Sequence, residues 1–358
     1  MKKVHVSAPG KLHLLGEHAV VYGKPAIITA VSKRCFVEII ARKDKKIEII
    51  STNLKASKIV TEKEIIAKTK DAQVKWETYI KTNDISLLRS ITSDPLDFPI
   101  VIIGETLKYL KKALPSGFKL SIKSDIPIGS GMGSSAALSV AIAGATYLLF
   151  NKTFDKEVVN EIAYLSEQKK HGFPSGGDNA ASCFGGMIWY RKETPDLKII
   201  KTIPFDFPQK LAKNFTAIHT GTPAESTGEM VSAVRTLYQE KPEFVENILS
   251  DQEKLVREIL GAIKSENELE LMRIMKEGER NLENLGVVSN SAKLFIRAIE
   301  KMGGAAKICG AGGIKKGSGM VLAYCVNKKS VEKLAASNRF SHINLSLGEE
   351  GLKEEKYE

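Results

Sequence analysis

The sequence predicts an α+β protein with two domains, and three observations lead to this prediction. The first part of the 358-residue chain contains several short runs of alternating or continuous apolar residues, which are typical of β-strands. A further strand-like run, residues 118–122, leads through a glycine-rich loop into a mostly apolar helix. Long helical segments between residues 224 and 302 are followed by two short β-like runs around a second glycine-rich loop.

Composition restricts the class of protein. With 43% hydrophobic and 27% charged residues, the chain can bury two cores and is too apolar to be disordered. The net charge of +11 suits anionic ligands such as nucleotides or carboxylates, although surface lysine also serves solubility. The four cysteines show no CxxC or Cys/His pattern, so neither a zinc site nor a disulfide framework is indicated. Because no targeting or membrane-spanning segment is evident, we expect a soluble cytoplasmic protein.

The first predicted domain, residues 1–200, begins with β-structure, which we expect to break at Pro9–Gly10. Strands are expected at residues 4–6, 28–31, 35–40, 46–50, 118–122 and 187–190. Residues 51–97 are lysine-rich and weakly patterned, so a solvated excursion with short helical pieces near 62–66 and 74–80 is expected. Helices are expected over 98–114, 136–150 and 155–170.

The second predicted domain, residues 201–350, is mainly helical at its start. The pattern loosens over residues 191–209, which makes this stretch the best candidate for the domain junction. A strand begins at residue 215, and helices are expected over 224–239, 243–263, 266–285, 290–302 and 330–336. A final strand-like run covers 343–347, and the charged tail from residue 348 is expected to be disordered.

The glycine-rich loop after residue 122 has the properties of a phosphate cradle. Gly129, Gly131 and Gly133 allow backbone N–H groups to approach an anion, and the following helix offers unpaired donors and the positive end of its dipole. Ser134 and Ser135 are good helix-capping residues. The spacing is neither that of a Walker A loop nor that of a dinucleotide fingerprint, so a tight strand-to-helix turn remains the alternative interpretation.

Further polar residues lie next to turns. Lys11, Glu17 and His18 are packed between apolar runs, where they either form edges of hairpins or belong to a site. Glu167 stands near a helix C-terminus, where a carboxylate meets an unfavourable dipole. The Gly/Pro-rich stretch 171–186 carries His171, Ser175, Asp178 and Asn179, and we expect a loop there that shapes a site.

Four segments together resemble the GHMP small-molecule kinases, and within them the mevalonate kinases most closely. These segments are residues 7–27, 127–140, 171–186 and 307–313. The resemblance implies an amino-terminal domain like ribosomal protein S5 domain 2 and a ferredoxin-like carboxy-terminal domain, with the active site between them. It also implies ATP and Mg²⁺ as cofactors. The expected partners are ATP and a small-molecule acceptor, without nucleic acid or membrane, and a homodimer is considered as the assembly.

The resemblance assigns roles to individual residues. Asp178 and Lys11 match the catalytic aspartate and lysine, and Ser135 and Glu167 match the magnesium-associated pair. The nucleotide-binding positions are Pro127, Gly129, Ser130, Gly131, Gly133, Ser134, Ser135 and Gly310. The substrate-side positions are Glu17, His18, Asp178, Thr220 and Gly312. An aspartate paired with a nearby lysine should stay ionised at neutral pH and could orient or deprotonate an alcohol.

The sequence departs from the family pattern in three places, of which the last bears on the acceptor. Gly177 stands where a branched apolar residue is usual, Lys315 and Lys316 interrupt a glycine run, and Glu225 replaces a common basic residue. The expected reaction is phosphorylation of the primary hydroxyl of (R)-mevalonate to 5-phosphomevalonate in isoprenoid synthesis. A kinase for phosphomevalonate, homoserine, a sugar or a sugar acid is the alternative, followed by a non-catalytic ATP-binding or nucleic-acid-binding protein.

Overall fold

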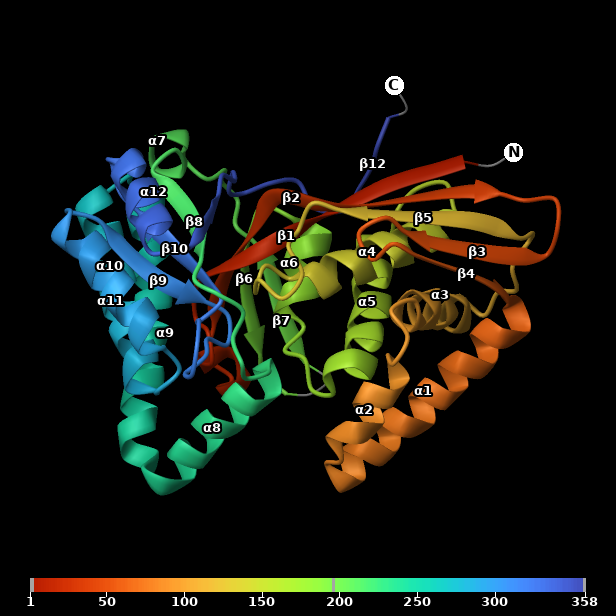
Figure 1. Cartoon of the computed structure of the whole chain (residues 1–358), viewed down its shortest axis with the longest axis horizontal. Helices are drawn as coiled ribbons and strands as arrows, with labels where there is room; N and C mark the ends of the chain where they lie inside the picture. The colour runs from red at the N-terminus through yellow and green to blue at the C-terminus, as the bar shows by residue number, and fades with distance from the viewer. Residues whose placement is uncertain (1–2, 195–196, 357–358) are drawn as a thin grey trace.

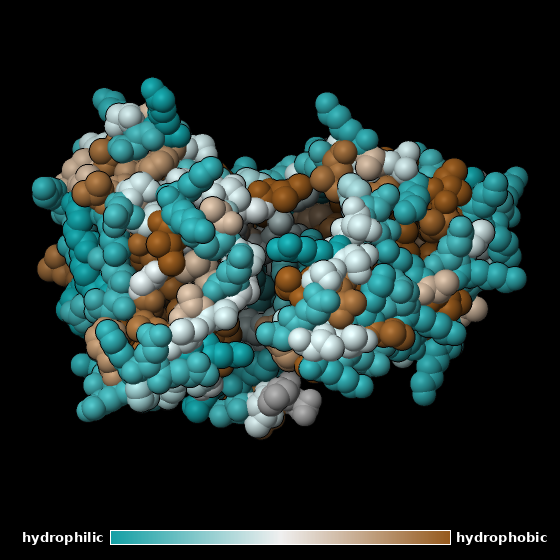
Figure 2. Space-filling model, turned by 60° about the horizontal axis from the view of Figure 1, so that its bottom comes forward, coloured by the Kyte–Doolittle hydropathy of each residue, from teal (hydrophilic) through white to brown (hydrophobic). Residues whose placement is uncertain are grey.

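The computed structural model describes residues 3–194 and 197–356 and has a mixed α/β fold built on two sheets (Figure 1). The larger sheet has the strand order β12-β1-β2-β5-β3-β4, and β6 adds to it by pairing with β2 and β7 by pairing with β6. The smaller sheet has the order β11-β8-β10-β9. The space-filling view shows the surface hollowed between the two halves that carry these sheets (Figure 2).

The larger sheet is organised around a long antiparallel pair, β1 and β2. Its strands are β1 (Lys3–Leu15), β2 (Ala26–Ala41), β3 (Lys46–Ser51), β4 (Ala56–Thr61), β5 (Phe118–Ser124), β6 (Met187–Lys192), β7 (Lys198–Thr202) and β12 (Lys353–Glu354). The expected break at Pro9–Gly10 is wrong, because β1 continues through it with a shift of register between these two residues. Such a bulge accommodates a proline, which cannot donate a hydrogen bond to the neighbouring strand.

Helices cover one face of this sheet. They are α1 (Glu62–Thr82), α2 (Ile85–Ile91), α3 (Asp97–Leu110), α4 (Ser134–Tyr147), α5 (Lys156–His171) and α6 (Gly177–Phe184). The central helix, α4, packs against β1, β2, α3, α5 and α6. Its residues 139–146 are all buried, and most of them are small, which lets the surrounding elements approach closely. The expected apolar helix is therefore confirmed.

The stretch 51–97 is not the solvated excursion that we expected. It contains β4 and the 21-residue helix α1, which stands out from the body of the molecule together with α2 (Figure 1). The helix starts with a capping box, in which Thr61 Oγ1 accepts from the N–H of Glu64 and the Glu64 carboxylate accepts from the N–H of Thr61. Only a narrow stripe of α1 is buried, and its many lysines conceal that stripe in the sequence.

The smaller sheet is backed by the predicted long helices. Its strands are β8 (Phe215–His219), β9 (Ala305–Cys309), β10 (Met320–Tyr324) and β11 (Ser341–Ile343). The helices of this half are α7 (Gln209–Ala212), α8 (Thr227–Glu240), α9 (Pro242–Lys264), α10 (Glu268–Asn284), α11 (Asn290–Lys301) and α12 (Lys328–Ser337). The last strand lies at the beginning of the expected run 343–347 and overlaps it at one residue only.

Both faces of the smaller sheet are apolar, and the side chains on one face pack against the half that contains the larger sheet. Leu14 on β1, Phe215 on β8 and Leu322 on β10 belong to one continuous buried cluster. Val321 on β10 belongs to a second cluster beneath α9 and α11, because successive residues of a strand point to opposite faces. The two halves are therefore packed on a shared apolar seam.

The domain junction expected within residues 191–209 stays a prediction, and one further expectation needs correction. The loosened stretch 191–209 contains the strand β7, which pairs with β6, although residues 195–196 lie outside the described part. The expected disorder of the tail is wrong for residues 348–356, because β12 pairs with β1 and Leu352 is buried; residues 357–358 lie outside the described part. Arg34 also donates to the carbonyl oxygens of Glu350 and Gly351, at 2.7 and 2.6 Å. No described helix has the length and apolar character needed to cross a membrane.

Candidate active site

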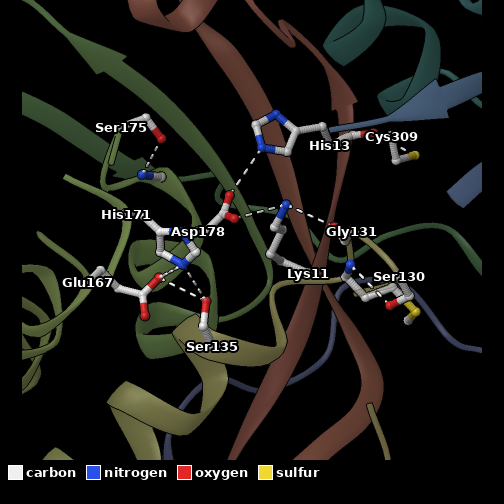
Figure 3. A network of polar contacts seen from close by, with 12 residues as sticks. Lys11, His13, Ser130, Gly131, Ser135, Glu167, His171, Ser175, Asp178 and Cys309 are labelled. Carbon is white, nitrogen blue, oxygen red and sulfur yellow. Dashed lines mark hydrogen bonds and ion pairs between the residues drawn. The ribbon is translucent and has the colours of Figure 1, made fainter. Parts of the chain in front are cut away.

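The structure brings the two predicted catalytic residues, Lys11 and Asp178, together beside the glycine loop (Figure 3). Lys11 comes from β1, Asp178 from the first turn of α6, and Gly131 from the loop before α4. Lys11 Nζ lies 3.1 Å from Asp178 Oδ2 and donates to the carbonyl oxygen of Gly131, also at 3.1 Å. Its side chain is 4% exposed, whereas that of Asp178 is 39% exposed. The carboxylate is therefore accessible while its cationic partner is not.

Asp178 has a second partner that sequence reasoning missed. His13 Nε2 lies 3.3 Å from Asp178 Oδ1, and His13 follows Lys11 by two residues on the same strand. Desolvation alone would raise the pKa of Asp178, but the charge of Lys11 and the contact with His13 together lower the pKa below its ordinary value. Asp178 is thus ionised at neutral pH. The two-residue spacing from Lys11 was the available signal, but it does not reveal what the shared face contacts.

Asp178 lies on a helix and not on the loop that we expected for this stretch. The helix α6 starts after Gly176, which has a φ of 93°, and its amino-terminal dipole favours the Asp178 charge. A Cβ atom at Gly177 would lie 2.6 Å from Cδ1 of Ile28. The departure from the family at Gly177 therefore allows α6 to lie close against β2. The Tyr190 hydroxyl, which donates to the carbonyl oxygen of Ser175, fixes the entry to the helix.

The glycine loop packs directly on Lys11. Gly129, Gly131 and Gly133 have φ values of 73°, 84° and 71°, which favour glycine. A Cβ atom at Gly133 would lie 2.9 Å from Cγ of Lys11. Ser130 is buried and donates to the carbonyl oxygen of Pro127 at 2.8 Å, which stabilises the turn. The loop is thereby held against the catalytic pair.

The two serines after the loop do not cap α4. Gly133 is the capping residue and makes no side-chain bond, and Ser134 and Ser135 are the first two residues of the helix. This arrangement leaves the hydroxyl of Ser135 free to contact α5 and leaves the first-turn N–H groups without a side-chain cap. An anion could take the place of the cap.

Ser135 and Glu167 lie together, as the resemblance implies. Glu167 is buried; its Oε2 accepts from Ser135 Oγ at 3.0 Å, and its Oε1 accepts from Ser139 Oγ at 2.8 Å. His171 Nε2 lies 3.1 Å from Ser135 Oγ and 3.5 Å from Glu167 Oε2. Desolvation lowers the pKa of His171 in spite of Glu167, so the imidazole is neutral at pH 7. Among the described residues, the ion-pair partner of Glu167 is therefore a neutral histidine, although the nearby Lys170 also acts on its charge.

Residues 3–194 and 197–356 contain no group of three or more His, Cys, Asp or Glu side chains that could hold a metal ion. The hydroxyl and carboxylate of Ser135 and Glu167 are hard oxygen donors of the kind that Mg²⁺ prefers. The donor set therefore fits a magnesium ion whose other ligands are water and phosphate oxygens, which is how Mg²⁺ is usually held next to nucleotides.

Glu17 and His18 are buried where the two halves meet. Glu17 forms an ion pair with Lys307 of β9, and its second oxygen has no hydrogen-bond partner among the described residues. His18 Nε2 lies 3.0 Å from the carbonyl oxygen of Ala311, and burial lowers the pKa of His18. Sequence reasoning missed Lys307, although a lysine within the apolar run of β9 is a recognisable signal.

Other predicted positions lie on the loops of the smaller half. The space that a Cβ atom would occupy at Gly310 is open, whereas at Gly312 such an atom would lie 2.0 Å from the carbonyl oxygen of Val287. The Thr220 hydroxyl donates to the carbonyl oxygen of Gly319 at 2.9 Å and accepts from the N–H of Ser318 at 3.2 Å. Gly312 and Thr220 therefore maintain local structure, and their substrate contacts stay predictions.

The Glu225 side chain forms hydrogen bonds with the loop between β9 and β10. Its carboxylate accepts from the backbone N–H groups of Ile314 and Lys315, at 3.3 and 3.2 Å. Lys315 and Lys316 themselves are exposed. The repulsion that Glu225 could exert on an anionic acceptor is thus reduced by two hydrogen-bond donors and a neighbouring cation.

A glycine loop at a helix start, a clamped aspartate and a serine–glutamate pair, placed between two sheets, define a small-molecule kinase of the GHMP class. Residues 101–186 match the family model of the GHMP kinases N terminal domain. The chain is 31% identical to the mevalonate kinase of Pyrococcus furiosus, with 99% of both chains covered, and 31% identical to that of Thermococcus sibiricus, with 87% of each covered. The crystal structure of the Methanococcus jannaschii mevalonate kinase has a TM-score of 0.76 at 23% identity and covers 97% of this chain and 98% of that one. The chain belongs to the mevalonate kinase family, and membership of this kinase family implies the use of ATP.

Proposed function

We propose that this protein transfers the γ-phosphoryl group of ATP to the primary hydroxyl of (R)-mevalonate and releases ADP and 5-phosphomevalonate. The observation that carries this proposal is the ionised, accessible carboxylate of Asp178, held by Lys11 beside the glycine loop. The names of the relatives and the reduced repulsion at Glu225 support mevalonate as the acceptor.

Each residue of the site has a role in this reaction. The loop 129–135 and the start of α4 bind the phosphates through backbone N–H groups. Asp178 accepts a hydrogen bond from the acceptor hydroxyl and orients its oxygen toward the γ-phosphorus, and Lys11 balances the charge that develops. As the new P–O bond forms, the bond to the β-phosphate breaks, and Asp178 receives the hydroxyl proton. Its lowered pKa favours a role in orientation over a role as a strong base.

Ser135 and Glu167 would hold Mg²⁺, which supplies charge neutralisation at the phosphates. Glu167 already accepts a hydrogen bond from Ser135, and its ion-pair partner among the described residues is His171. A bound divalent ion would remove the cost of keeping this carboxylate buried and ionised.

We also propose a division into an S5-like domain, residues 1–200, and a ferredoxin-like domain, residues 201–350. The two sheets support this division, although the segment after residue 347 returns to the larger sheet. Cytoplasmic location and a homodimer stay predictions.

The acceptor is tested with an ADP-release assay on a panel of (R)-mevalonate, 5-phosphomevalonate, homoserine, galactose and a sugar acid. We expect the highest kcat/KM with (R)-mevalonate. We also expect Asp178→Asn to abolish most of the turnover of (R)-mevalonate, which would show that the activity arises at this site. Turnover of phosphomevalonate or a sugar acid without turnover of mevalonate would contradict the proposed acceptor. Absence of turnover with every acceptor would favour a non-catalytic ATP-binding protein.

A further inference from the structure

His13 is a buried imidazole next to the reacting groups, and the proposed reaction has so far given it no role. Because side chains two residues apart on a strand share a face, His13 and Lys11 both point from β1 toward Asp178 (Figure 3). Lys11 contacts one oxygen of the carboxylate and His13 contacts the other, at 3.1 and 3.3 Å. The carboxylate is therefore held at both oxygens by a single strand.

The protonation of His13 follows from its partner. Ionised Asp178 can only accept hydrogen bonds, so Nε2 of His13 carries the proton and donates it. The other ring nitrogen, Nδ1, is buried and has no hydrogen-bond partner in the described residues. The imidazole therefore directs its Nε2–H toward Asp178.

The backbone at His13 is in contact with strand β9 of the smaller sheet. The carbonyl oxygen of His13 accepts from the Cys309 thiol at 3.4 Å, and the register of β1 and β2 shifts between His13 and Leu15. A register shift of this kind redirects the side chains next to it. The position of the imidazole is thus determined by both halves of the protein.

We propose that His13 is a positioning residue that keeps the Asp178 carboxylate in the orientation needed to receive the acceptor hydroxyl. The torsion that turns a carboxylate about its last bond is broad, so one contact does not fix it, whereas two donors on two oxygens do. Lys11 also bonds to Gly131 and, in the proposed reaction, compensates phosphoryl charge. His13 holds Asp178 independently of that second task. The inference rests on the proposed function, because it assumes that Asp178 meets the acceptor.

The test compares His13→Leu with His13→Gln. The glutamine amide can donate to Asp178 without charge, and leucine cannot donate. We expect His13→Leu to lower kcat about 10- to 100-fold, as the loss of a hydrogen bond to a charged group should, with the KM for ATP changed less than about twofold. His13→Gln should recover most of the lost kcat. The matched control is His5→Leu, which replaces a histidine on the same strand whose ring lies near Phe36.

A readout without turnover separates this inference from the proposed function. In ¹⁵N NMR spectra, we expect the His13 ring as the Nε2–H tautomer and expect its signal to shift in Asp178→Asn, whichever acceptor the enzyme uses. If mevalonate is not the acceptor, the kcat comparison is made with the acceptor that is turned over.

Three results would overturn the inference: wild-type kcat in His13→Leu, equal losses in the leucine and glutamine variants, or an Nδ1–H tautomer in the wild type. If His13→Leu fails to fold, His13→Asn takes its place, because the shorter amide is polar but does not reach Asp178. Equal kcat values for the asparagine and glutamine variants would then count against the proposal.

Discussion

The charge of the Asp178 side chain can be tested by a single substitution. Asp178→Asn keeps the shape of the side chain and its place at the start of α6 but removes the charge that orients the hydroxyl. We expect kcat to fall by about 10² to 10⁴ while ATP binding, followed by calorimetry, is retained. Asp206→Asn, at an exposed aspartate, is the control. A kcat for Asp178→Asn within a few-fold of wild type would exclude Asp178 from the mechanism.

Glu167 and Ser135 can be tested as magnesium ligands. Glu167→Gln and Ser135→Ala each remove a hard oxygen, so both should raise the Mg²⁺ concentration needed for half-maximal rate. Ser139→Ala is a matched control, because Ser139 bonds to the same carboxylate from within the core. We expect a smaller shift for this control. Identical magnesium titrations for wild type and both test variants would make Glu167 a structural carboxylate.

Residues of the site that lie in recognisable sequence patterns could be predicted. The contacts that surround these residues in the folded protein could not be predicted. Lys11, Ser135 and Asp178 occur in such motifs, Glu167 stands out at a helix end, and the structure brings the four to one place. His13 occurs in an apolar run of the kind found in the interior of a β-strand, so the run does not mark it as a residue of the site. Its partner is 165 residues away, and no local pattern encodes that distance.

The loop before α4 can be tested as an element. Gly133→Ala places a Cβ atom against Lys11 and also forces a left-handed backbone, which should cost about 1 kcal/mol or more. Gly303→Ala has the same backbone strain, with a φ of 79°, and open space around the added atom. We expect similar losses of thermal stability but at least a tenfold loss of kcat for Gly133→Ala alone. Equal activity of both variants would show that close packing of the loop on Lys11 is not needed.

Long elements with a clear period were predicted correctly, and elements stabilised at their ends were missed. The helices α8 to α11 have regular apolar stripes and appear within a few residues of the predicted positions. The start of α1 carries a Thr61–Glu64 capping signal, but its buried face is narrow. The start of α6 depends on Gly176 and Tyr190, which come together only in the folded protein. Propensity alone cannot detect such contacts.

A buried charge cluster at the seam affects the whole molecule. Lys307 pairs with Glu17 across the two halves, and Glu279 of α10 accepts from the N–H of Ile308 at 2.9 Å. Burial raises the pKa of Glu279 to about 8, because the loss of solvation outweighs the hydrogen bond and the nearby Lys307. The folded protein thus keeps a proton on Glu279 that the unfolded chain releases near its ordinary pKa of 4.5.

This difference predicts a decline in stability with pH. The contribution of Glu279 is fully present below pH 4.5 and is lost as the pH rises toward 8, by an amount on the order of a few kcal/mol. Denaturant unfolding at pH 5, 6.5 and 8 should therefore show a steeper decline for wild type than for Glu279→Gln, which cannot ionise. Glu277→Gln on the same helix is exposed and serves as the control. Parallel curves for wild type and Glu279→Gln would refute a protonated Glu279.

The pairing of β12 with β1 limits what can fold during synthesis. Glu354 leaves the ribosome hundreds of residues after its partner Val6, which at about 5–20 residues per second is a delay on the order of 20–70 s. Throughout that interval Val6 and Ser7 lack their strand partners, and an unpaired strand edge is the kind of surface to which other strands can add. A nascent chain stalled before residue 350 should therefore remain cleavable by protease near β1, and release of residues through 356 should protect it. The larger sheet therefore lacks the pairing between β12 and β1 until residues 353–354 have been translated.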